Sequence, residues 1–230
     1  MRPRVAALES PEHRLASLAS RLRSHPWVRD LRVFLPMADA GPGAGLEQPT
    51  ALVVPSADGV RALRLGGKQR LVAAWEPEVG RAGQPRATGL DLWLVDALPP
   101  AGREAVAVAE ASRTAPVVSD LVHDSKLPSL TCRVLVPYDL PVFRGHFPSR
   151  PIVPGVVQIG WAVDIARAEG VVSGTFAGIS GAKFRRVLQP GMNLGLRLDG
   201  HDGSRQLRFE YSLGSRVVSG GRVQFGGAHA

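Results

Sequence analysis

The chain has 230 residues, 44% of them hydrophobic and 21% charged, which suits a globular protein with one large domain or two small ones. Its single cysteine, Cys132, excludes an internal disulfide, suits the reducing cytoplasm, and is expected to be a small buried side chain rather than a reactive thiol. The net charge is +8, and no continuous apolar stretch near the N-terminus indicates a signal peptide or a membrane span, so a cytoplasmic protein is expected.

The first hundred residues alternate between helical and strand patterns. Leu15, Leu18 and Leu22 lie on one face of a helix predicted over residues 11–24, which Pro26 ends. A second helical pattern is interrupted by the Gly66-Gly67 pair. Strands are expected at 28–36, 50–56 and 89–100. These elements predict a small α+β module over residues 1–105, followed by a linker over residues 106–120.

The second half has a different pattern. A strand is expected at 131–137, a long apolar helix at 155–170, and successive antiparallel strands from residue 175 to residue 225. One buried helix followed by strands that wrap around it predicts an α+β domain over residues 121–230.

The positive charge is concentrated in this second half. Residues 1–120 contain 15 Lys and Arg against 13 Asp and Glu, a net charge of +2, whereas residues 121–230 contain 13 against 7, a net charge of +6. An acidic partner, either nucleic acid or an acidic carrier protein, suits this excess, as does the arginine-rich composition of high-GC genes. Nucleic acid is not expected, because aromatic residues are only 6% and no run interleaves them with Arg or Lys.

The segment FRGHFPSRPIVPGVVQ (143–158) combines one histidine with residues that restrict the backbone. Three prolines fix φ between His146 and the predicted helix. The helix begins near Gly155, which lets a ligand approach the backbone, and its first amides have no intrahelical acceptor. The amides of Gly155 and Val156 therefore form an expected oxyanion site beside a potential base, His146, which suits chemistry next to a carbonyl.

Two motifs carry a family resemblance. GHFPSRPIVPGVVQ resembles the active-site signature of the hotdog-fold 3-hydroxyacyl-acyl-carrier-protein dehydratases of fatty-acid synthesis, and AKFRRVLQPGMNL (182–194) resembles the strand and turn that follow their central helix. PGVVQIGWA is similar to the dehydratase-like domains of aryl polyene and related pigment pathways. The resemblance covers about residues 121–226.

This resemblance implies a curved antiparallel sheet around a buried helix. It also implies a dimer, either a homodimer or a heterodimer with a related hotdog protein, with active sites at the subunit interface. The implied substrate is a 3-hydroxyacyl chain on the phosphopantetheine arm of an acyl carrier protein. No metal and no redox cofactor is expected, because the reaction moves only protons and the histidines lack metal-ligand spacing.

The resemblance also assigns catalytic roles. His146 matches the base that removes the proton alpha to the thioester, and the carboxylate expected fourteen residues later is replaced by Gly160. Asp164 lies one helical turn beyond Gly160 on the same face, about 6 Å along the axis. We hypothesise that Asp164, or a water it holds, supplies the acid. The alternative is that Asp164 pairs with Arg167 or Arg185, or simply caps a polar patch.

Other positions have two interpretations each. Gln158 points into the site or the dimer interface, or it is an interior glutamine bonded to backbone. Trp161 contacts substrate, or it packs in the core. The cations Lys183, Arg185 and Arg186 steer the carrier protein and hold the phosphopantetheine phosphate, or they form a solvated strand face. The expected substrate-binding residues are Phe147, Pro154, Gln158, Gly160, Trp161, Lys183, Phe184, Arg185 and Arg186.

The N-terminal module resembles, less specifically, the small C-terminal subdomain of acyl-adenylate-forming ligases. The likeness lies in ASRLRSHPWVRDLRVFLP and in the GLDLWLVDALPPAGRE segment. Arg103 occupies the place of the ligase lysine that helps form the adenylate, and arginine does not reproduce the compact charge of lysine. The large nucleotide-binding subdomain is absent from the sequence, so we expect a docking or stabilising module without adenylation activity.

Three functions remain to be distinguished. The first is dehydration of a 3-hydroxyacyl thioester on a carrier protein. The second is a hotdog acyl thioesterase, which would release a free acid. The third is a catalytically impaired binding module or heterodimer partner, because the usual helix carboxylate is Gly160.

Overall fold

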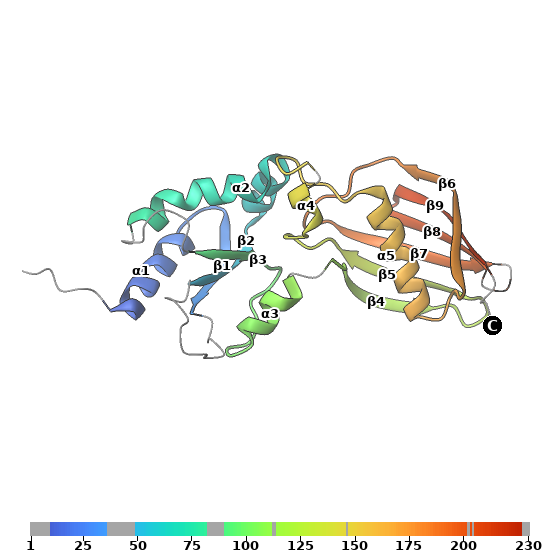
Figure 1. Cartoon of the computed structure of the whole chain (residues 1–230), viewed down its shortest axis with the longest axis horizontal. Coiled ribbons are helices and arrows are strands. Elements are labelled where there is room, and N and C mark those ends of the chain that lie inside the picture. Colours follow the sequence, from blue (N-terminus) through green and yellow to red (C-terminus); the bar gives the residue numbers. More distant parts are fainter. Residues whose placement is uncertain are drawn as a thin grey trace, which may run out of the picture. The chain divides into compact units, whose positions relative to one another are not determined.

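The computed structural model describes residues 10–35, 49–81, 90–111, 114–145, 147–201, 203 and 205–226. The chain divides into two compact units, shown in Figure 1. The first unit comprises Met1–Ser112 with the short segment Pro148–Arg150, and the second comprises Arg113–Phe147 with Pro151–Ala230. Within the described ranges, no helix has both the length and the hydropathy that crossing a membrane requires.

The first unit is built on a three-stranded sheet. Its elements are α1 (Pro11–Arg23), β1 (Val28–Phe34), β2 (Thr50–Pro55), α2 (Ala57–Arg81), β3 (Asp91–Leu94) and α3 (Glu104–Ala111). The central strand β2 is antiparallel to β1 and parallel to β3, and all of its residues are buried. Gly67 has a φ of +68° and interrupts α2 at the glycine pair, where the sequence predicts a break. Arg103 is exposed immediately before α3.

The second unit is a six-stranded antiparallel sheet with a long helix against one face (Figure 1). The strand order is β4-β5-β7-β8-β9-β6, which leaves β4 and β6 at the two edges. The elements are β4 (Val117–His123), β5 (Ser129–Leu135), α4 (Val142–Gly145), α5 (Gly155–Ala168), β6 (Thr175–Phe184), β7 (Asn193–His201), β8 (Gln206–Leu213) and β9 (Arg216–Gly226). This α+β arrangement is the hotdog fold.

Alternating side chains explain how the helix is held. In β7 and β8 every second residue is buried, so each strand presents one apolar face to α5 and one polar face to solvent. The helix contributes Ile159, Trp161, Ala162 and Val163 to the shared core. The position of α5 is therefore set by its apolar face, and its first turn is fixed against the sheet.

A helix and a strand occupy the region that the sequence predicts to be a linker, residues 106–120. The helix α3 is short and rich in alanine, and it packs through Ala107, Val108 and Ala111 on a small cluster in the first unit. Strand β4 is an edge strand whose residues are mostly exposed. Asp120 has a φ of +52° and the pairing with β5 shifts register there, so a bulge interrupts the alternation on which strand prediction depends.

Candidate active site

The start of helix α5 leaves two backbone amides without an intrahelical acceptor. Pro154 is the N-cap residue, and no described side chain caps the helix. The Pro154 carbonyl accepts hydrogen bonds from the amides of Val157 and Gln158, each at 3.1 Å. The preceding amides, of Gly155 and Val156, have no intrahelical acceptor and lie at the positive end of the helix dipole. They have the character of oxyanion donors.

Aromatic and aliphatic side chains surround this helix start. A Cβ atom added at Gly155 would lie 2.6–2.9 Å from three ring carbons of Phe184, so the ring packs directly on the glycine. Val156 is 72% exposed and Phe184 is 45% exposed. The apolar surface beside the two amides is thus accessible to solvent.

The expected base, His146, lies outside the described residues. Its neighbours are described: Gly145 is the last residue of α4, and Phe147 is exposed with a φ of +54°. A left-handed backbone is uncommon for a residue with a side chain. The chain therefore makes a sharp local bend next to the histidine.

Gln158 is engaged in the core. The side chain is 2% exposed, its amide group donates a hydrogen bond to the Val153 carbonyl at 3.0 Å, and its oxygen accepts one from the Ser219 hydroxyl at 2.7 Å. This is the interior glutamine of the second interpretation, and the structure does not place it as a substrate contact.

Trp161 is also a core residue. It is 4% exposed, and its indole N–H donates a hydrogen bond to the Thr114 carbonyl at 2.8 Å. The ring lies in the apolar cluster between α5 and the sheet. Packing, and not substrate contact, accounts for the tryptophan.

Gly160 and Asp164 are accessible on the next turns of α5. A Cβ atom at Gly160 would meet no atom within 4 Å, and Asp164 is exposed. Among the described residues, Asp164 has no ion pair or hydrogen bond through its carboxylate. Arg167 donates instead to the Gly174 carbonyl at 2.9 Å and lies 5.5 Å from the centre of the Phe225 ring. In the described part of the chain, Asp164 forms an ion pair with neither Arg167 nor Arg185, the two expected alternative partners.

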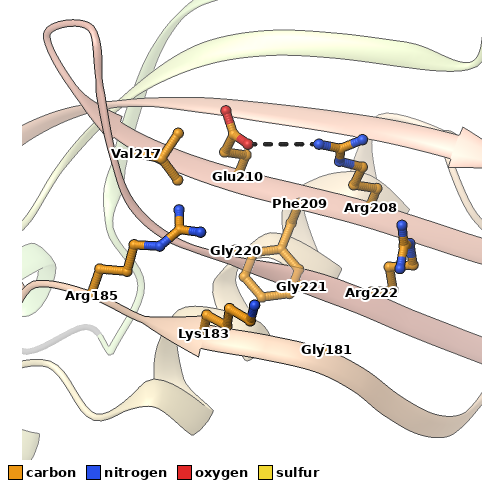
Figure 2. A pocket seen from close by; sticks show the side chains of 10 residues that line it. All are labelled: Gly181, Lys183, Arg185, Arg208, Phe209, Glu210, Val217, Gly220, Gly221 and Arg222. Atoms are coloured by element: carbon orange, nitrogen blue, oxygen red, sulfur yellow. Dashed lines mark ion pairs between the residues drawn. The ribbon is translucent and has the colours of Figure 1, made fainter.

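A basic hollow lies on the solvent face of the sheet, across β6, β8 and β9 (Figure 2). Its volume is about 550 Å³, part of it open to solvent. Two adjacent glycines of β9, Gly220 and Gly221, are among its lining residues. Its lining includes four cations and one carboxylate: Lys183, Arg185, Arg208, Arg222 and Glu210.

Backbone geometry turns Lys183 toward this hollow. Gly181 has a φ of +60°, and the β6–β9 register shifts between Ser180 and Lys183, which is a glycine-containing bulge. Lys183 consequently pairs with Gly220, the residue that also faces Glu210.

Two of these cations are expected from the sequence, and two are not. Lys183 and Arg185 line the hollow, whereas Arg186 is exposed outside its lining. Arg208 and Arg222 were not expected, although charged residues alternate with apolar ones in β8. Glu210 is the one carboxylate among the described lining residues, and it approaches Arg208 only to 3.9 Å. Because four cations line the hollow, its net charge is positive.

Cys132 is not part of a reactive site. Burial raises the pKa of its thiol to about 11, and the nearby charge of Glu169 adds to this effect. The thiolate is consequently scarce at neutral pH, in line with the expected small buried side chain.

Comparison with protein families matches residues 122–222 to a model described as ApeI-like, ApeI dehydratase. A curated relative, 3-hydroxyacyl-[acyl-carrier-protein] dehydratase FabZ of Chlamydia pneumoniae, is 36% identical over 34% of this chain and 58% of its own length. The FabZ of Chlamydia trachomatis serovar L2 is 31% identical over 46% of this chain and 76% of its own length. The chain spans about half the length of the first relatives it matches.

Two of the solved structures that are similar to this chain share about 30% of its residues over the matched region. One is the dehydratase heterocomplex ApeI:P from Xenorhabdus doucetiae, 29% identical over 47% of this chain and 96% of that one, with a TM-score of 0.44. The other is an uncharacterized protein from Erwinia carotovora subsp. atroseptica, 32% identical over 47% of this chain and 94% of that one, with a TM-score of 0.40.

Proposed function

The chain belongs to the hotdog-fold dehydratase family, and we propose that its second unit removes water from a 3-hydroxyacyl thioester carried by an acyl carrier protein. The single supporting observation is the start of α5, where two uncapped amides adjoin accessible apolar side chains. Chains of the fatty-acid or aryl polyene type fit that apolar surface. The phosphopantetheine arm of the carrier holds the substrate, and the reaction uses no further cofactor.

In the proposed reaction, the thioester carbonyl oxygen accepts hydrogen bonds from the amides of Gly155 and Val156. His146 removes the alpha proton while negative charge develops on that oxygen. The α-C–H and β-C–O bonds break, a carbon–carbon double bond forms, and the departing hydroxyl leaves as water. No electrons are gained or lost overall.

The departing hydroxyl needs a proton, and Asp164 is the proposed donor. Gly160 cannot supply it, and Asp164 is the accessible carboxyl one turn further along α5. Because its carboxylate has no partner among the described residues, it is available to hold a water or the hydroxyl.

The basic hollow is the proposed docking site for the carrier protein. Lys183 and Arg185 follow one another on either side of Phe184, whose ring reaches Gly155. Alternate side chains of an extended segment point to opposite faces of the sheet. The same segment can therefore present its cations to solvent and Phe184 to the proposed acyl site on the helix side. Acidic helices and the phosphate of the arm match this charge.

A second hotdog subunit is the proposed partner at strand β6, in a homodimer or a heterodimer. β6 is an edge strand with unpaired backbone groups on one side, and Phe176 and Ile179 are 53% and 43% exposed. Pairing would cover both. Sedimentation of the wild type and of Ile179→Lys tests this; a wild-type monomer argues against it.

An impaired partner subunit is the second candidate function. The observation that favours it is the empty space above Gly160, where the family has a carboxylate. In this case the chain holds an acylated carrier or pairs with a catalytic hotdog protein.

Mass spectrometry of a 3-hydroxyacyl carrier protein incubated with the chain tests the dehydratase proposal. Wild type should yield the enoyl thioester, lighter by one water, and His146→Ala should be slower by about 10²–10⁴-fold. Asp164→Asn should lose activity to a similar degree; unchanged turnover would remove Asp164 from the mechanism. A free acid would indicate a thioesterase, and no product at all would favour the impaired partner.

A further inference from the structure

Three buried hydrogen bonds tie the first turn of α5 to its surroundings, and Gln158 takes part in all of them. The side-chain amide group donates to the Val153 carbonyl, and the side-chain oxygen accepts from Ser219. The Tyr211 hydroxyl donates to the Gln158 backbone carbonyl at 2.9 Å. Gln158, Tyr211 and Ser219 are each 2% exposed or less, so these bonds are shielded from water.

Two of the three partners of Gln158, Ser219 and Tyr211, lie in one row across the sheet. Ser219 of β9 pairs with Tyr211 of β8 on one side and with Phe184 of β6 on the other. Phe184 is the ring that packs on Gly155. The row therefore contacts the helix start twice, through hydrogen bonds to Gln158 and through the ring on Gly155.

Gln158 also fixes the chain that enters the helix. Val153 is bonded to the Gln158 side chain through its carbonyl, and its amide donates to the Leu188 carbonyl at 2.8 Å. The segment from Val153 to Gln158 is thus closed by a side chain, with Pro154, Gly155 and Val156 inside the loop.

We infer that Gln158 is a positioning residue, which holds the amides of Gly155 and Val156 in the orientation that binds the thioester oxygen. This inference rests on the proposed function and extends it to a residue that does not contact the substrate. A displacement of about 1 Å of such donors costs on the order of 10²-fold in rate.

Glutamine suits this role because one side chain both donates and accepts. Leucine, of similar size, would leave the Val153 carbonyl and the Ser219 hydroxyl without partners. The wild-type bonds are also independent of pH over the working range. Burial raises the pKa of Tyr211 far above its ordinary value, and the pKa of Cys132, in the same row, is about 11.

Gln158→Glu tests the positioning role, because a purely structural role would not produce the pH-dependent change in kcat that is expected here. The protonated carboxyl donates to the Val153 carbonyl and accepts from Ser219, as the amide does, whereas the ionised carboxylate cannot donate. Burial raises the carboxyl pKa above about 4.3. The ratio of variant to wild-type kcat should fall about 10- to 100-fold as the pH rises from about 5 to about 8, with a smaller change in KM.

Two further variants complete the experiment. Gln158→Leu should lower kcat by a factor that does not vary with pH. Leu207→Ala, which removes a fully buried apolar side chain at the far end of β8, should reduce stability and leave the kcat ratio near one. Circular dichroism at each pH checks that every variant is folded, and division by the wild-type value removes the pH effects that both proteins share.

A structural readout separates this inference from the proposed function. In a pH titration of Gln158→Glu followed by NMR, the amide resonances of Gly155 and Val156 should shift as the introduced carboxyl ionises. The wild-type resonances should lack this titration step. If wild type makes no enoyl product but the step is present, dehydration is wrong and the positioning role stands. If the step is absent and the kcat ratio does not change with pH, the inference is overturned.

Discussion

At the scale of single residues, Gly160 is the position at which the proposed active enzyme and the proposed impaired partner can be distinguished by experiment. No atom lies within 4 Å of a Cβ at this residue, and its φ is not in the left-handed region, so a larger side chain is tolerated. Gly160→Glu should raise the dehydration rate by about 10²-fold or more if the site lacks only its acid.

The matched control is Gly160→Gln, which has the same size and helix propensity but no carboxyl. Product formation by mass spectrometry compares the two variants with wild type. If glutamate and glutamine give equal rates, the missing carboxylate does not limit the reaction. A rate that is already high in wild type and unaffected by glutamate would instead support Asp164 as the acid.

The sequence leaves some residue roles open because they depend on which face of α5 meets the sheet. Gln158 and Trp161 have two interpretations each in the sequence, and only the packing of the helix shows that both are buried. Their partners, Ser219 and Thr114, are 61 and 47 residues away in the chain, so no local pattern indicates them. The roles of His146 and Asp164 in catalysis stay predictions.

At the scale of elements, the approach of β6 to the start of α5 makes a specific demand on Gly155. A Cβ there would lie 2.6 Å from the nearest ring carbon of Phe184. Gly155→Ala should cost about 1–3 kcal/mol of stability, because the ring or the helix start must move. It should also lower kcat by displacing the two amides.

Thermal unfolding and the dehydration assay measure both effects of Gly155→Ala. Gly160→Ala, in the same helix but with open space, should instead stabilise the protein by roughly 0.5–1 kcal/mol, since alanine favours the helix. Phe184→Leu should relieve the clash in the double variant. Equal stability of the two single alanine variants would contradict the packing of Phe184 on Gly155.

Element prediction succeeds where the periodic pattern is strong and fails where it is broken. The expected strand at 131–137 and helix at 155–170 correspond to β5 and α5, because each buries a continuous apolar face. The break in α2 at Gly66-Gly67 could be predicted because a pair of glycines inside a helical pattern is itself a local signal. In contrast, α3 buries no residue fully and β4 contains a bulge, so neither has the regular pattern that sequence analysis needs.

At the scale of the whole molecule, the sequence shows which half of the chain carries the excess positive charge, but not the surface on which the cations gather. Residues 121–230 carry a net charge of +6, and the sheet brings Lys183 of β6 and Arg185, just after β6, together with Arg208 and Arg222. These strand pairings join residues that are distant in the chain. Sequence alone therefore predicts a basic domain, and the register of β6, β8 and β9 is needed to find the hollow.

Reversing the charge of the basic hollow should weaken the use of a carrier-bound substrate. Arg222→Glu should raise KM for a 3-hydroxyacyl carrier protein by roughly tenfold at low salt, with kcat unchanged, because attraction between the surfaces is lost. The effect should shrink as ionic strength rises above about 0.15 M, where the screening length is about 8 Å. Steady-state kinetics at two salt concentrations measures this.

Arg61→Glu is the control, because it changes the net charge equally at an exposed position in the first unit. A 3-hydroxyacyl pantetheine thioester without the carrier should give the same KM with wild type, Arg222→Glu and Arg61→Glu. If Arg61→Glu weakens carrier binding as much as Arg222→Glu, overall charge and not the hollow attracts the carrier. If Arg222→Glu also impairs the small thioester, the hollow contacts the acyl substrate itself, and the carrier must dock elsewhere on the molecule.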